Sequence, residues 1–164
     1  MRNIANLSTA ERIEQLLLEN TFNHVRKTIT FTGASGLGLV DVVVPIFTIT
    51  GRVLLEDICA YCTVNLAGAT ATISLGTAID VDAFVAVTTA TDVDADEWWT
   101  GAAPAVGSKS PVNVETGGLV ISQGKKLLRE DIIVNPLVET VTGGVLIVDA
   151  WYRPITDGSG LTGD

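Results

Sequence analysis

The segment Gly51–Leu75 constrains the fold most, because it has the pattern of two consecutive β-strands joined by a turn. Residues 52–66 are rich in Val, Leu, Ile, Cys and Tyr, residue types that suit strands or buried positions. Residues 69–75 alternate between apolar and hydroxyl side chains, which is the period of a half-buried strand. Asn65–Gly68 supplies the residue types of a tight turn. The pattern predicts an antiparallel hairpin that forms one wall of a β-sandwich, because its apolar face must pack against a second sheet.

Strand patterns continue through most of the remaining chain. Pro45 interrupts one of them and predicts a bulge or a sheet edge at that point. The last two patterns are joined by Thr142-Gly143-Gly144 and predict a final hairpin. About eight strands with frequent turn signals predict an all-β fold, an antiparallel β-sandwich of jelly-roll-like architecture. The predicted strands outside the first hairpin are 26–32, 39–50, 79–87, 112–114, 119–122, 132–140 and 145–154. Within 79–87 we expect Ile79, Val81, Ala83, Val85 and Val87 to face inward, with Asp80 and Asp82 facing outward.

The N-terminal region carries a helical signal. The predicted parts of the chain are a helix or arm at 1–25, a sandwich domain at 26–155 and a flexible tail at 156–164. Ser8 and Glu11 fit a capping box at the start of the helix. Ile13, Leu16 and Leu17 fall on one face at helical spacing and are candidate interface residues. A helix this short must dock to be stable, either on its own sandwich or, as an arm, on a neighbouring subunit.

Composition and charge argue against two kinds of partner. Hydrophobic residues make up 47% of the chain and aromatic residues 5%, a β-rich profile that suggests partner chains covering some apolar surface. No stretch approaches the roughly 18 uninterrupted apolar residues of a membrane helix, and the N-terminus lacks a secretory apolar core, so we expect a cytoplasmic origin and no membrane partner. The net charge is −9, and the chain has no Lys or Arg between Arg52 and Lys109. We therefore expect no nucleic-acid partner.

Three motifs suggest chemistry, but none meets its requirements. Cys59 and Cys62 form a lone CxxC inside a strand pattern, which predicts two buried, reduced thiols on opposite faces of the strand. Thr32–Gly38 is similar to a dinucleotide-binding turn, yet a strand pattern follows where that motif needs a helix, so we expect a Gly-rich loop. His24 is the only histidine and belongs to no catalytic motif, which indicates a surface or capping residue. We predict no enzyme, no cofactor and no catalytic residue.

An acidic segment, Asp92–Glu97, precedes Trp98 and Trp99. It lacks the Gly and Glu that an EF-hand loop needs, so a solvated loop is expected, with a looser divalent-ion site as the alternative. On a strand the two tryptophans point to opposite faces, so we expect one to be buried and one exposed. Both are candidate interface residues, with core or interface packing favoured over stacking on a sugar.

Several segments together resemble small virion proteins of tailed bacteriophages and prophages. The segments are Ile46–Val53, Cys62–Ala67, Ala71–Ala78, Ala90–Ala95 and the final pattern Val145–Tyr152 running into Arg153-Pro154-Ile155-Thr156. The resemblance implies a capsid-decoration or cement protein, or a head fibre, that assembles as a trimer or other small oligomer. It also implies the major capsid protein and further copies of the chain as partners, and the virion as location. The alternative is a carbohydrate- or receptor-binding module that uses Trp98, Trp99 and the nearby acids.

Overall fold

The computed structural model describes residues 22–34, 37–100, 114–115 and 125–163, which form two antiparallel sheets packed face to face. Sheet A has the order β1-β10-β3-β6-β7, and β8 pairs with β3 outside this path. Its strands are β1 (Asn23–Thr30), β10 (Gly143–Pro154), β3 (Val53–Ala67), β6 (Trp98–Trp99), β7 (Val114–Glu115) and β8 (Lys126–Leu128). Sheet B contains, in order, β11 (Gly160–Gly163), β2 (Val44–Thr50), β9 (Ile132–Leu137), β4 (Thr72–Thr77) and β5 (Val85–Thr89), and a 3-10 turn, η2 (Ala90–Asp92), follows β5. The predicted all-β antiparallel sandwich is confirmed.

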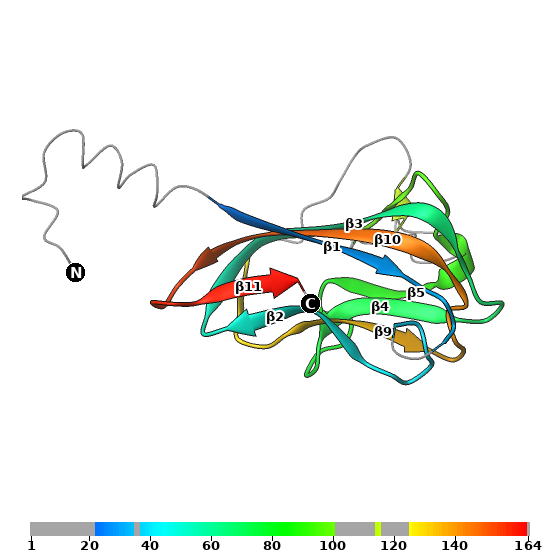
Figure 1. The fold of residues 1–164 in the computed structure, drawn as a ribbon, viewed down its shortest axis with the longest axis horizontal. Coiled ribbons are helices and arrows are strands. Elements are labelled where there is room, and N and C mark those ends of the chain that lie inside the picture. The colour runs from blue at the N-terminus through cyan, green and yellow to red at the C-terminus, as the bar shows by residue number, and fades with distance from the viewer. Residues whose placement is uncertain (1–21, 35–36, 101–113, 116–124, 164) are drawn as a thin grey trace, which may run out of the picture.

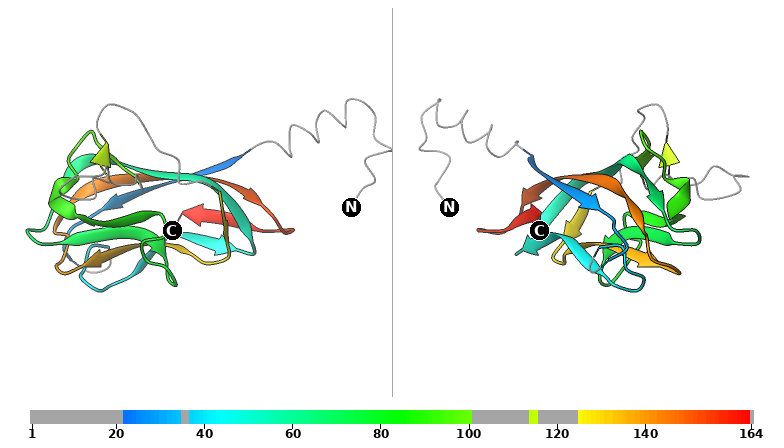
Figure 2. Two further views of the ribbon diagram at one scale, coloured as in Figure 1. Left: turned by 180° about the vertical axis from the view of Figure 1, so that it is seen from behind. Right: turned by 45° about the vertical axis from the view of Figure 1, so that its right-hand side comes forward.

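The strands β1 to β4 alternate between the two sheets, as do β8 to β11, which is the arrangement of a jelly roll (Figure 1). In sheet A, β10 lies between β1 and β3, and in sheet B, β9 lies between β2 and β4. Strands from early in the chain are therefore hydrogen-bonded to strands from its last third, which is the wrapped Greek-key arrangement of this architecture. β11 extends sheet B beside β2. Figure 2 shows the two layers from two further directions.

Alternate residues of the facing strands fill the interior between the sheets. Leu146, Val148 and Ala150 of β10 are fully buried, as are Ile73 and Leu75 of β4. Side chains of a strand alternate between its faces, so the residues between these point away from the core. Full burial of one Leu or Ile side chain stabilises the fold by about 1.5–3 kcal/mol. The apolar interior is thus the main source of stability of the sandwich.

The two predicted hairpins are wrong, because each pair of strands is divided between the sheets. β3 pairs with β10, β6 and β8, whereas β4 pairs with β5 and β9. The chain crosses from β3 to β4 at Gly68, whose φ of 144° favours glycine and where a Cβ would lie 2.8 Å from the carbonyl oxygen of Thr140. β9 and β10 are divided in the same way. Alternation locates a strand but does not identify its partner.

The predicted strand 79–87 is also corrected, because β5 begins only at Val85. Ile79 and Val87 were expected to face inward, but both are exposed, Ile79 by 77%. Residues 78–84 form a loop, and the Ser74 hydroxyl donates a hydrogen bond of 2.8 Å to the Val81 carbonyl oxygen in it. Ser74 lies between two inward-facing residues of β4, so the loop covers the outer face of sheet B.

Gly76 allows this loop to close on the sheet. The Thr77 amide donates a hydrogen bond of 2.7 Å to the Asp80 carbonyl oxygen, which tightens the turn directly after β4. A Cβ on Gly76 would lie 2.2 Å from the Asp80 carbonyl oxygen and 2.4 Å from the Val81 carbonyl carbon. Both distances are far inside van der Waals contact, so this position requires glycine.

Strands are present at both ends of the described chain. β1 begins at Asn23, within the range 1–25 predicted as helix or arm, and residues 1–21 lie outside the described residues. The tail 156–164 was predicted to be flexible, but Gly160–Gly163 pairs with β2 as β11. Leu161 of β11 is buried and packs in the core. The free edge of β2 offers backbone partners to a segment whose composition alone suggests a mobile tail.

The prediction of a bulge or a sheet edge at Pro45 is confirmed. This proline pairs with Ile133 of β9, and a register shift follows before Phe47. On the other side of β2, β11 pairs only with Phe47 to Thr50, so Pro45 lies beyond that ladder. The predicted strands 112–114 and 119–122 fall outside the described residues, apart from Val114, which belongs to β7.

Candidate functional site

The outer face of sheet A, called here the outer A face, collects most of the polar and aromatic side chains of this sheet. The odd-numbered residues of β10 point to it, because the even-numbered residues 146 to 152 pack in the core. The register between β1, β10 and β3 then defines three cross-strand rows. The rows are His24–Trp151–Asp57, Arg26–Asp149–Cys59 and Thr28–Ile147–Tyr61, the last continued by Trp98 of β6.

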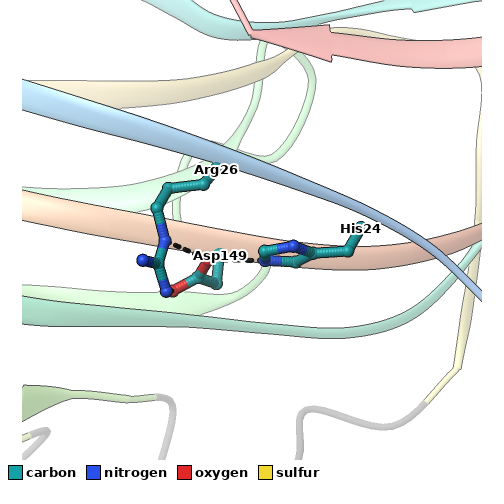
Figure 3. A network of polar contacts seen from close by, with 3 residues as sticks. All are labelled: His24, Arg26 and Asp149. Carbon is teal, nitrogen blue, oxygen red and sulfur yellow. Dashed lines mark hydrogen bonds and ion pairs between the residues drawn. The ribbon is translucent and has the colours of Figure 1, made fainter.

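Asp149 is the centre of a polar cluster on this face (Figure 3). Arg26 donates two hydrogen bonds to it, from Nε to Oδ1 at 2.8 Å and from Nη2 to Oδ2 at 3.0 Å. Nε2 of His24 lies 2.6 Å from Oδ1. The Asp149 side chain is only 5% exposed. Burial by itself would raise its pKa, but the hydrogen bonds and charges of Arg26 and His24 outweigh burial and lower the pKa of Asp149 below its ordinary value.

The cluster lacks an activated nucleophile. The His24 ring stacks on Trp151, with ring centroids 5.0 Å apart. Cys59 lies opposite Asp149 in the register and is buried. Its burial is the main cause that raises its pKa to about 12, and the negative charge of Asp149 is the second cause. Such a thiol stays protonated, whereas a nucleophilic cysteine needs a lowered pKa. The prediction that His24 is a surface residue is confirmed, since its side chain is exposed. These contacts hold the side chains of the cluster in place on the face.

The prediction that Cys59 and Cys62 are buried, reduced thiols on opposite faces of one strand is confirmed. Both cysteines are free and buried. Cys62 belongs to the core cluster, whereas Cys59 lies in the outer row with Asp149, so the two thiols occupy opposite faces of β3. Burial raises the pKa of Cys62 to about 11.

The two tryptophans divide as predicted, one buried and one partly exposed. Trp99 is fully buried, and its Nε1 donates a hydrogen bond of 3.0 Å to Thr88 Oγ1. Trp98 lies on the outer A face with its ring centroid 4.9 Å from that of Tyr61. The Tyr61 hydroxyl donates a hydrogen bond of 2.8 Å to Asp96 Oδ1, which raises the pKa of Tyr61. Tyr61 was not among the predicted site residues, because only the pairing of β3 with β6 brings it beside Trp98.

The loops at one end of the sandwich are acidic. In the described parts of the loops after β1, β3, β5 and β9, every charged residue is acidic. These residues are Asp41, Asp92, Asp94, Asp96, Glu97 and Glu139. Two of them accept hydrogen bonds from neighbouring segments. Asn65 Nδ2 donates a hydrogen bond of 2.6 Å to Asp94 Oδ1, and the Thr70 amide donates one of 2.8 Å to Glu139 Oε2. Among the residues that the structure describes, no group of three or more His, Cys, Asp or Glu side chains is arranged to hold a metal ion.

At the opposite end of the outer A face, Glu56 anchors two cations. It is nearly buried, with Oε2 3.0 Å from Lys125 Nζ and Oε1 2.9 Å from Arg153 Nε. The Arg153 guanidinium in turn lies 4.4 Å from the ring centroid of Phe22. A hollow of about 320 Å³ beside this group is lined by Phe22, Glu56, Asp57 and Trp151. The charge of Glu56 is therefore paired with two cations of the same chain.

The other candidate interface residues, Ile13, Leu16 and Leu17, lie outside the described residues. Within the described ranges, no helix has the length and apolar character needed to cross a membrane. No protein-family model, curated protein or solved structure matches this chain. The fold and the outer A face define the class of the chain as a jelly-roll β-sandwich with one polar and aromatic sheet face.

Proposed function

We propose that the protein is a non-enzymatic structural component of a bacteriophage particle, a decoration or cement protein that binds the major capsid protein through the outer A face. The sequence resemblance to phage virion proteins motivates the particle, and jelly rolls are frequent among viral capsid proteins, which is an argument by analogy of fold. In this proposal the protein acts as several copies on the virion, and a trimer is the oligomer that the resemblance implies.

The character of the outer A face is the observation that carries the proposal. Trp, Tyr and Arg dominate the energetics of protein interfaces, and this face presents Trp98, Tyr61, Trp151 and Arg26. Two of its carboxylates, those of Asp149 and Glu56, already have cationic partners within the chain. Covering a neutralised ion pair is less unfavourable than covering a lone charge, so such a face is suited to burial under a partner.

Co-sedimentation with capsids tests this proposal. Capsids of the phage that carries the gene, prepared without this protein, are mixed with the purified chain and pelleted. We expect saturable binding that falls at least tenfold for a Trp98→Ala/Trp151→Ala variant. Val87→Ser is the matched control, because Val87 is an exposed apolar residue of β5 in sheet B. Chain that stays in the supernatant, or equal binding of all three proteins, would contradict the proposal.

One observation favours a second candidate, a carbohydrate-binding module. The Tyr61–Trp98 ring pair lies beside Asp96, so this part of the face combines aromatic rings on which a sugar could stack with a carboxylate that could accept its hydrogen bonds. The fold also occurs in lectins, again by analogy. A glycan array probed with the parent chain and with Trp98→Ala separates this candidate from the first. Binding that Trp98→Ala abolishes would support it, and an array without binding would reject it.

A further inference from the structure

The hollow of about 320 Å³ beside Glu56 combines the residue types of a small-ligand site. Phe22 and Trp151 contribute aromatic rings to its lining, and Glu56 and Asp57 contribute carboxylates. Phe22 is 48% exposed, whereas the Glu56 side chain is only 8% exposed, so the carboxylate of Glu56 lies deeper than the phenyl ring. Ligand pockets in proteins begin at about 300 Å³, so this hollow is suited to a ligand of about one ring.

A bulge in β3 brings the two carboxylates to the same face. The register with β10 shifts directly after Trp151, which is opposite Asp57. Leu55 and Ile58 are both buried in the core, so Glu56 and Asp57 are consecutive residues that both turn to the outer A face. Regular alternation would send one of two adjacent carboxylates into the apolar interior. A bulge that re-aims a side chain is a device often found beside functional sites.

The side chains that line the hollow are held in place before any ligand binds. The Trp151 ring stacks on His24, which belongs to the polar cluster of Figure 3. The Arg153 guanidinium lies 4.4 Å from the ring centroid of Phe22. Oδ1 of Asp57 accepts a hydrogen bond of 2.9 Å from the amide of the following residue. Groups that are already ordered lose little conformational entropy on binding, which favours affinity.

The charges around the hollow balance. Glu56 and Asp57 carry two negative charges, and Lys125 and Arg153, which both pair with Glu56, carry two positive charges. In the adjoining cluster, the charge of Asp149 is offset by its guanidinium partner. By this count of the described residues, neither a cation nor an anion has a net electrostatic advantage, so the hollow suits a neutral ligand.

The lining also defines the polarity of that ligand. Ionised carboxylates accept hydrogen bonds and cannot donate them, so the ligand must supply the donors. Aromatic rings favour an apolar surface of the ligand. A pyranose ring is neutral, has a face of C–H groups and carries hydroxyl donors around its rim, so it meets all three requirements.

We propose that this hollow binds one pyranose unit of a carbohydrate. The C–H face of the sugar packs on the aromatic rings, and its hydroxyl groups donate hydrogen bonds to Glu56 and Asp57. The inference goes beyond the proposed function, because it assigns a small ligand in place of a protein partner. It is also a different site from the Tyr61–Trp98 pair, because four residues of β3, or roughly 13 Å, separate Asp57 from Tyr61.

NMR of the tryptophan indoles tests the site on the full chain. The three tryptophans give three Nε1–H signals, which Trp98→Phe and Trp99→Phe variants assign. The probes are the methyl glycosides of glucose, galactose, mannose and N-acetylglucosamine, and glycerol is the control that has hydroxyl groups but no ring. We expect at least one glycoside to shift the Trp151 signal saturably, while the signal of the buried Trp99 stays in place.

An acid-to-amide change tests the role of the carboxylate. We expect Asp57→Asn to weaken glycoside binding roughly tenfold, because one hydrogen bond to a charged group is lost. The amide side chain keeps an oxygen for the backbone hydrogen bond, and an unchanged circular dichroism spectrum shows that the fold is retained. Asp82→Asn is the matched control, because Asp82 is exposed in the loop 78–84 against sheet B, and it should bind like the parent.

Three results would overturn the inference. The first is a Trp151 signal that no glycoside shifts more than glycerol does. The second is a glycoside response that is confined to the Trp98 signal or that Asp57→Asn leaves unchanged. The third is a Trp151 signal that shifts with tetramethylammonium and with no glycoside, because this would make the hollow a cation site. These measurements contain no capsids, so sugar binding and the proposed function can fail independently.

Discussion

Arg26 and Asp149, 123 positions apart in the chain, face each other across β1 and β10 as a two-point ion pair. Because this pair lowers the pKa of Asp149, it stabilises the fold above the unfolded-state pKa, near 3.8, and this contribution is lost as pH falls through the lower folded-state pKa. We predict that Asp149→Asn lowers the free energy of unfolding at pH 7 by about 1–3 kcal/mol. Urea denaturation at pH 7 and at pH 2.5 measures this, and the difference from the parent should shrink at the lower pH. A difference independent of pH would refute the ionic explanation.

Gly76 should tolerate no side chain, because a Cβ would meet the backbone of the loop 78–84. We predict that Gly76→Ala lowers the free energy of unfolding by about 1–3 kcal/mol or more through overpacking. Thermal denaturation followed by circular dichroism measures the change. Gly143→Ala is the matched control, because a Cβ there makes only an ordinary contact of 3.6 Å with Ala67. Equal midpoints for the two variants would show that the loop does not lie against β4.

Trp98 and Trp99 should differ sharply in their effect on stability, although they are adjacent. Trp99→Phe removes the hydrogen bond to Thr88 and leaves space in the core, so we expect a loss of about 1–3 kcal/mol. Trp98→Ala removes a partly exposed ring from the outer A face, and we expect a loss of less than about 1 kcal/mol. Chemical denaturation measures both. The reverse order of stability would mean that the two rings occupy exchanged faces.

The two thiols should react slowly with alkylating and disulfide reagents. Cys59 and Cys62 are buried, and burial raises their pKa values to about 12 and about 11, so almost no thiolate is present at pH 8. We expect negligible reaction with Ellman's reagent in the native state and two reactive thiols in 6 M guanidinium chloride. Rapid labelling of the native protein would contradict the described burial of β3.

Local patterns predicted many strand positions but few strand partners. The alternation before Leu75 marks β4 correctly, because a strand that lines the core leaves its period in the sequence. The placement of β3 and β4 in different sheets depends on their pairing with β10 and β9, which come much later in the chain. β11 was missed because Leu161 is its only large apolar residue and the free edge of β2 supplies the rest of its contacts.

The same limit applies to the outer A face. The sequence predicts that Trp98 and Trp99 point in opposite directions and that Cys59 and Cys62 do so as well, since both follow from the period of one strand. The contact of Arg26 with Asp149 depends instead on pairing between β1 and β10. The assignment to a phage particle stays a prediction that rests on resemblance and on the character of this face.

Quantitative mass spectrometry of gradient-purified phage particles tests the central proposal most directly. We predict that the chain is present in a fixed copy number relative to the major capsid protein, in particles from independent preparations. Its absence from the particles, or an amount that varies from one preparation to the next as a contaminant does, would contradict a structural role in the virion.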